Sequence, residues 1–171
     1  VFGGGFNSVN NSLRLLRGGT TLTIGAGVTV RGHTGSIGYN AIWGGPDNVG
    51  VINQGTISAD VSGGTIYIRA EPFTNTGVLR SLAGTLELAG TITTSGLETF
   101  EGAGGTCTVR LTGFLDNTTA NLVLDGPSNV LWMQGGTILG GTLSVISGAE
   151  LVFGSGTLDG VTVNGDLDLS G

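Results

Sequence analysis

The sequence contains no lysine and has only one cysteine, one histidine and three prolines among its 171 residues. The lack of lysine excludes a phosphate-binding loop of the G-x-x-x-x-G-K type. Six arginines against twelve acids leave a net charge of −6, which disfavours binding to nucleic acid or to an anionic membrane. The single Cys107 excludes an internal disulfide. No apolar run reaches the roughly 18 residues of a membrane-spanning helix, so neither nucleic-acid binding nor membrane insertion is expected.

Glycine, in contrast, is abundant, with 35 residues of 171. The scarcity of proline and the lack of a three-residue glycine period exclude a collagen triple helix. The chain is 39% hydrophobic and only 11% charged, the reverse of a disordered chain. Glycine together with many β-branched residues predicts short strands joined by tight turns. The length suits one domain, which we expect to span residues 1–171.

Internal repeats are the strongest signal in the sequence. NQGTI at 53–57 returns after 22 residues as NTGVL, and GGTIYI at 63–68 returns after 20 residues as AGTLEL. Residues 45–57 also match residues 126–138, and this offset of 81 residues corresponds to four periods. Self-similarity at such a period indicates a repeat architecture. An antiparallel sandwich does not explain it, and a propeller repeats at about twice this length, roughly 40–45 residues.

Short strands with alternating apolar residues recur at this period. We expect them at Thr21–Ile24, Thr65–Ile68, Thr85–Leu88, Thr106–Val109, Thr142–Val145 and Gly160–Val163, with two further members at Ala41–Trp43 and Asn121–Leu124. They predict an all-β fold, a parallel β-helix (β-solenoid) of about eight coils of roughly 20 residues. Its variable turns favour the right-handed kind. The side chains expected to point inward form two ladders: Leu22, Ile66, Leu86, Cys107, Leu143 and Val161, and Ile24, Ile68, Leu88, Val109, Val145 and Val163.

The segments 52–60, 73–77 and 158–169 resemble the repeats of very large bacterial secreted proteins, namely autotransporter passengers and filamentous-haemagglutinin-like adhesins. The resemblance implies a right-handed parallel β-helix that projects from the cell surface, and therefore an extracellular location. The shared motifs consist mainly of glycine, threonine, asparagine and aliphatic residues, so the resemblance specifies a style of fold and no ligand.

The acidic residues are scattered along the chain and do not form a catalytic cluster. Asp166 and Asp168 alternate with leucines and are expected to face solvent, where they and Asp159 could hold a cation. A solvated edge that discourages wrong strand pairing explains them better. Glu98 and Glu101 are expected at a corner. The nonapeptide repeat that binds Ca²⁺ in β-rolls is missing.

The nucleophile and metal-ligand candidates are equally sparse. His33 is the only histidine and has no acid or cysteine near it in sequence, which argues against a metal site or a Ser-His-Asp triad. Cys107 is expected on an inward ladder, as a small core side chain rather than a nucleophile. We therefore predict no catalytic, cofactor-binding or metal-binding residues, and no cofactor.

Two surface functions remain open. Sugar rings could stack on four aromatic residues, Tyr39, Trp43, Tyr67 and Trp132. Tyr67 is expected to point outward. Trp132 aligns with the core position Val51 and is therefore expected inside. Ice binding by threonine ladders is disfavoured, because only the outward pairs Thr21/Thr23 and Thr106/Thr108 are Thr-x-Thr, whereas Thr65/Tyr67, Thr85/Glu87 and Thr142/Ser144 are not.

The main hypothesis is a non-enzymatic structural or adhesive module of an extracellular bacterial fibre, stalk or filament. We expect residues 165–171 to form a strand and neither end to carry a polar cap. The chain is thus expected to be a segment of a longer solenoid, or a fibre subunit that self-associates through its ends. The alternative is a carbohydrate-binding or carbohydrate-degrading β-helix with surface glycans as partners. A row of acids or aromatics on one face would favour this alternative.

Overall fold

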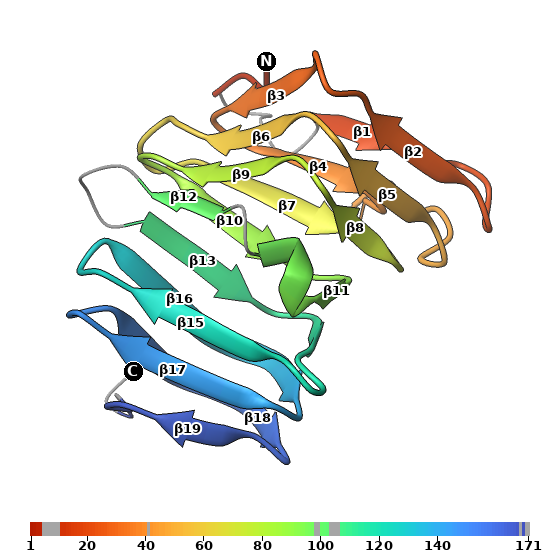
Figure 1. Ribbon diagram of the computed structural model, residues 1–171. Helices are drawn as coiled ribbons and strands as arrows, with labels where there is room; N and C mark the ends of the chain where they lie inside the picture. Colours follow the sequence, from red (N-terminus) through yellow and green to blue (C-terminus); the bar gives the residue numbers. More distant parts are fainter. Residues whose placement is uncertain (5–10, 41, 98–99, 103–106, 168, 170–171) are drawn as a thin grey trace.

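The computed structural model describes residues 1–4, 11–40, 42–97, 100–102, 107–167 and 169. More than half of the described residues lie in strands, and these strands stack in a β-solenoid of about six turns (Figure 1). All ladders between the named strands are parallel. The prediction of a parallel β-helix is therefore confirmed.

Each coil contributes strands to successive sheets. The first sheet contains β2 (Thr21–Ile24), β5 (Gly50–Asn53) and β8 (Phe73–Asn75). The second contains β3 (Thr29–Gly32), β6 (Thr56–Ala59), β9 (Val78–Ser81) and β12 (Phe100–Gly102). Lower in the stack, a separate sheet contains β15 (Asn121–Asp125), β17 (Thr142–Ile146) and β19 (Thr162–Asn164).

The largest sheet runs along the whole solenoid and positions the site discussed below. Its strands are β1 (Ser12–Arg14), β4 (Gly35–Gly38), β7 (Thr65–Arg69), β10 (Thr85–Leu88), β13 (Cys107–Leu111), β16 (Asn129–Leu139) and β18 (Glu150–Asp159). The short strands β11 (Thr91–Thr93) and β14 (Phe114–Asp116) join it through the far end of β16, and a 3₁₀ turn, η2 (Thr94–Leu97), follows β11.

The prediction of eight coils is wrong, because the coils are not of equal length. Thr142 pairs with Thr162, 20 residues later, but Gly35 pairs with Ile66, 31 residues later. Much of the difference lies between β4 and β5, where the described residues 39–40 and 42–49 lie outside the named strands; we call this segment the 39–49 excursion. Fewer coils therefore fit into the same chain.

The predicted inward ladders are out of register at Cys107. Leu86 pairs with Val109, whereas Cys107 pairs with Asn129. A slip of two residues keeps each side chain on the same face, so alternation alone cannot detect it. The Cys107 side chain lies outside the described residues. The inward ladder of the large sheet instead contains Ile66, Leu86, Val109, Leu131 and Leu151, all of them buried.

Other members of the predicted ladders belong to different sheets. Leu22 pairs with Val51 in the first sheet, and Leu143 pairs with Leu122 in the lower sheet. Leu143 is fully buried, as predicted, but Leu22 is only partly buried because it lies on the first coil. Val161, just before β19, is likewise partly buried on the last coil.

Two of the predicted strands are also wrong. In the segment Ala41–Trp43, the described residues Ile42 and Trp43 form a turn, held by the Asn40 side chain, whose Oδ1 accepts both their backbone N–H groups at 2.9 Å. In the segment 165–171, the described residues lie outside any strand, because β19 ends at Asn164. The segment Asn121–Leu124, by contrast, is confirmed as part of β15.

The repeated Asn-x-Gly motif locks the corner between the first and second sheets. Asn53 and Asn75 are 0% and 6% exposed, and Asn53 Nδ2 donates to Asn75 Oδ1 over 2.7 Å. Asn75 Nδ2 then donates to Gly96 O at 2.9 Å and Gly77 O at 3.3 Å. The motif thus connects three successive coils, because a buried polar corner needs internal partners.

Candidate functional site

Four outward side chains form a continuous row across the large sheet, which we call the outward row: Tyr67, Glu87, Arg110 and Trp132. The strand register places them side by side on β7, β10, β13 and β16. Their sequence neighbours point inward to the core, so the row lies on the outer face. A stack of two aromatic and two charged residues distinguishes this face from one built of threonine and serine.

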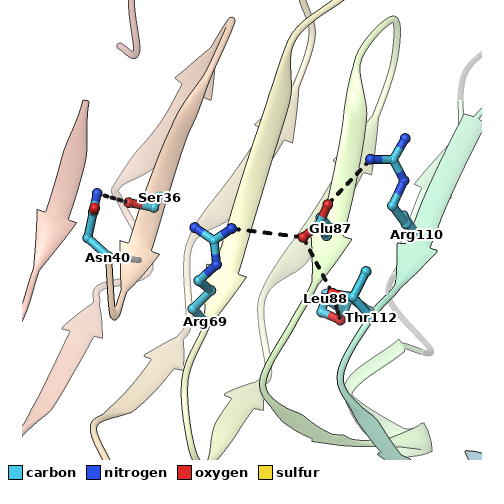
Figure 2. Close-up of polar contacts among 7 residues, drawn as sticks. All are labelled: Ser36, Asn40, Arg69, Glu87, Leu88, Arg110 and Thr112. Atoms are coloured by element: carbon cyan, nitrogen blue, oxygen red, sulfur yellow. Dashed lines mark hydrogen bonds and ion pairs between the residues drawn. The ribbon is translucent and has the colours of Figure 1, made fainter. Parts of the chain in front are cut away.

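Glu87 lies at the centre of the row and is only 8% exposed. Arg110 Nη1 lies 3.4 Å from Glu87 Oε2, and Arg69 Nη2 approaches Glu87 Oε1 to 4.0 Å (Figure 2). Thr112 Oγ1 donates to the same Oε1 at 3.4 Å. An outward carboxylate is tolerated at this depth because two arginines and a hydroxyl replace its water contacts.

Both arginines also stack on aromatic rings. The guanidinium carbon of Arg69 lies 4.3 Å from the centroid of the Tyr67 ring, and that of Arg110 lies 5.6 Å from the Trp132 ring. Such contacts are worth roughly 0.5–1 kcal/mol at exposed sites. The two guanidinium groups are therefore held by two kinds of contact each, which restricts their rotamers.

Two arginines against one glutamate give this network a local charge of +1 on a protein of net charge −6. Arg110 Nε and Trp132 Nε1 are buried without a hydrogen-bond partner among the described residues. Trp132 Nε1 lies against Gly154, where an added Cβ would approach it to 3.1 Å. The side chains of Arg69 and Arg110 are about one quarter exposed, so each ion pair stabilises the fold by less than about 1 kcal/mol.

Two hollows share Arg69 in their linings. The larger, of about 230 Å³, is lined by Tyr39, Asp47, Arg69, Ala70, Glu71, Ala89 and Gly90. The smaller, of about 110 Å³, is lined by Thr34, Gly35, Ser36, Asn40, Ile42, Tyr67 and Arg69. Arg69 belongs to both linings. The 39–49 excursion, which follows β4, contributes Tyr39 and Asp47 to the larger hollow and Asn40 and Ile42 to the smaller one.

The excursion is anchored beside the hollows by its own polar contacts. Asn40 Nδ2 donates to Ser36 Oγ on β4 at 2.8 Å, and Figure 2 shows this pair on the opposite side of Arg69 from Glu87. Arg14 Nη1 donates to the backbone carbonyl of Trp43 at 2.9 Å. Asn40 is 2% exposed, so this wall of the smaller hollow is well fixed.

The structure brings together two residues that were separate candidates in the sequence. Tyr39 and Tyr67 line two hollows that have Arg69 in common. The prediction that Trp132 packs inside is wrong, because it lies on the outer face between the buried residues Leu131 and Met133. Correct alignment of TIYIR, TLEL and TVRL at 65, 85 and 108 would have placed the outward row.

The remaining candidates form no chemical site in the described residues. His33 Nδ1 contacts Thr34 Oγ1 at 2.8 Å and has no acid beside it. Asp159 and Asp166 are exposed, and Asp168 lies outside the described residues, as do Glu98 and the side chain of Glu101. Over the described ranges, no group of three His, Cys, Asp or Glu residues is placed to hold a metal ion.

The threonine pairs do not form a continuous flat surface. Thr65, Thr85 and Thr108 are neighbours on the large sheet, but Tyr67, Glu87 and Arg110 occupy the positions beside them. On the first sheet, Thr21 pairs with Gly50, which carries no side chain. Long side chains next to the short threonine row make this face uneven.

A further cavity, of about 350 Å³, shares no lining residue with the outward row. Its lining consists mainly of apolar side chains: Leu97, Val109, Leu122, Val123, Leu124, Val130 and Leu131, with Thr94, Asn121 and Asn129. It adjoins β15, which has no ladder with β12 in the described part of the chain. No charged residue belongs to this lining, so it does not add to the polar site.

Searches with this chain match no protein-family model, no curated protein and no solved structure. The described part of the chain contains no helix with the length and hydropathy of a membrane span.

Proposed function

We propose that this protein is a non-enzymatic structural and adhesive module of an extracellular bacterial fibre, stalk or surface filament, in which solenoid coils stack end to end. The observation that carries the proposal is the open strand edge at each end of the stack. β1 and β2 at one end, and β18 and β19 at the other, each have a strand ladder on one side only among the described strands, whereas Phe2 bridges part of the outer edge of β3 at Gly32. An open edge is a template for another strand.

The last coil also leaves apolar surface partly uncovered. Leu158, Val161 and Leu167 pack against the core but remain partly exposed, whereas Ile138, the partner of Leu158 on the preceding coil, is fully buried. A further coil, from the same chain or from a second copy, would cover them. Contact between unlike ends does not close on itself and therefore produces a fibre. The extracellular location rests on the resemblance of the repeats to secreted adhesins.

Sedimentation velocity on a variant with a blocked edge tests the stacking. Thr162 donates its N–H to Gly141 O, on the side of β17. Parallel strands direct successive N–H groups to opposite sides, so the N–H of Val163 faces the open edge. Val163→Pro removes this donor and is expected to abolish association that the wild type shows at micromolar concentration, whereas Val163→Thr keeps the N–H and should still associate. A wild-type chain that remains monomeric would overturn the proposal.

The outward row and its hollows favour a carbohydrate ligand for the adhesive part of this role. A purely structural solenoid needs no aromatic and charged stack on one face, and short polar residues would cover it equally well. Carbohydrate binding is therefore the second candidate function, carried by the large sheet, and the ends of the solenoid are not required for it.

A further inference from the structure

We propose that the two hollows beside Arg69 form one binding site for a neutral oligosaccharide, with adjacent sugar units on either side of the guanidinium group. This assigns a ligand class to the proposed adhesive role and rests on it. Tyr67 and Arg69 of β7 line the smaller hollow, and Arg69 with the residues that follow β7 and β10 lines the larger one, while the 39–49 excursion contributes to both. The two linings share Arg69, so one ligand that occupies both hollows would contact this residue in each.

The polar groups of the site match the hydroxyl groups of a sugar. Asp47 and Glu71 supply carboxylate acceptors in the larger hollow, and Arg69 supplies donors to both. Ser36 and Asn40 add a hydroxyl and an amide in the smaller hollow. Sugar hydroxyls both donate and accept, so a mixed set of planar donors and acceptors suits them better than it suits a single ion.

The charge of the larger hollow selects against acidic sugars. Asp47 and Glu71 are exposed and stand against one arginine, which gives a local charge of −1. A uronate carboxylate placed here would meet two like charges, which disfavour binding. Two carboxylates and one arginine also make a poor cation site, because the arginine offsets half of their charge and no third ligand is present among the described residues.

Tyr39 is the aromatic platform of the site. One face of the Tyr67 ring is occupied by Arg69 at 4.3 Å, so Tyr67 serves to hold the guanidinium group. Tyr39 lines the larger hollow and has no such cover among the described contacts. Its ring is therefore the surface on which a sugar ring stacks.

Arg69 is already oriented before a ligand arrives. It is held by the Tyr67 ring and by Glu87, whose carboxylate is fixed in turn by Arg110. A side chain that is ordered in advance loses less entropy on binding. The outward row thus acts as a support for the binding group, which explains why so large a polar network stands on one face of the solenoid.

The site can be tested by titrating ¹⁵N-labelled protein with cellotetraose, maltotetraose, N-acetylchitotetraose and trigalacturonate. We expect at least one neutral tetrasaccharide to shift backbone amides of residues 36–40, 67–71 and 89–90. Tyr39→Ala and Arg69→Gln should each weaken that binding roughly tenfold, the loss expected for a ring-stacking contact. Arg31→Gln is the matched control, because Arg31 lies on β3, in the second sheet, and pairs with Asp60.

Three results would overturn the proposal. These are no shift with any neutral tetrasaccharide at millimolar concentration, binding of trigalacturonate alone, or unchanged affinity in both site variants. The amide spectra of the variants show directly whether they are folded. Sedimentation without sugar tests end-to-end stacking separately, so failure of the sugar site is distinguishable from failure of the structural role.

Discussion

Replacement of Asn75 by alanine tests how the corner of the solenoid is held together. The Asn75 side chain accepts from Asn53 Nδ2 at 2.7 Å and donates to Gly96 O at 2.9 Å and Gly77 O at 3.3 Å. Alanine removes all three contacts, and the space is too enclosed for free solvation because Asn75 is 6% exposed. Two successive coil contacts are lost together.

The expected loss of stability follows from the groups left behind. Asn53 Nδ2 keeps only a 3.4 Å contact with Val78 O, and Gly96 O loses its short partner. A buried group without a partner costs about 1–3 kcal/mol. We therefore expect Asn75→Ala to lower the free energy of unfolding by roughly 2–5 kcal/mol, a large fraction of the 5–15 kcal/mol typical of a domain.

Urea denaturation followed by circular dichroism measures this change. Asn121→Ala is the matched control, because Asn121 is exposed on β15 and its side chain only accepts a 3.0 Å bond from Ser144 Oγ. The control should change the free energy of unfolding by less than about 0.5 kcal/mol. If Asn75→Ala were no more destabilising than Asn121→Ala, the account of the corner as a buried polar lock would be refuted.

Three further predictions concern the core, a coil contact and a turn. Leu86 is fully buried, so Leu86→Asp should prevent folding, because an unpaired buried charge costs several kcal/mol; a soluble, folded variant by circular dichroism would contradict the inward position of Leu86. A Cβ at Gly90 would lie 1.9 Å from Ala70 O, so Gly90→Ala should destabilise the stack by about 1–3 kcal/mol in thermal unfolding, and an unchanged melting temperature would argue against this close approach. Hydrogen bonds from the Thr118 side chain and backbone N–H lower the pKa of Asp116. The stabilisation from these hydrogen bonds is therefore present at neutral pH and lost as the pH falls through the lowered pKa. NMR titration should show that Thr118→Val raises the pKa of Asp116, and an unchanged pKa would refute this cause.

The fold class could be predicted from the sequence because the repeats recur at nearly constant spacing. The Asn-x-Gly copies at 53 and 75 do lie on neighbouring coils and touch each other. Threonine-led segments such as those at Thr65 and Thr85 also pair as the alignment predicted. Such agreement is expected where each coil has the same length, since stacked coils place equivalent residues side by side.

The predicted strand register is wrong where the spacing between repeats varies. Thr106 and Thr108 both begin an alternating segment, and only the strand pairing shows that Thr108 aligns with Thr85. With this two-residue error the predicted alignment does not place Arg110 beside Glu87, and the sequence therefore does not predict the outward row. The repeat spacing predicts a strand at Ala41–Trp43, but the Asn40 side chain holds Ile42 and Trp43 in a turn.

The candidate site was predictable only in part. Tyr39 and Tyr67 were recognised as possible sugar-stacking residues, but their placement around Arg69 depends on how the excursion folds back. Trp132 was assigned to the core by alignment with Val51, although the two residues belong to different sheets. Repeats specify neighbours along the solenoid axis and do not specify how an irregular segment packs on its outer face.

The central claim, that coils stack end to end, is tested most directly by electron microscopy and fibre diffraction of the 171-residue chain at micromolar concentration. We expect elongated, unbranched filaments with a repeat of about 4.8 Å along the filament axis, the spacing of strands within a sheet. A compact monomer in which β1 to β3 at one end and β18 and β19 at the other are ordered yet solvent-exposed would contradict the account.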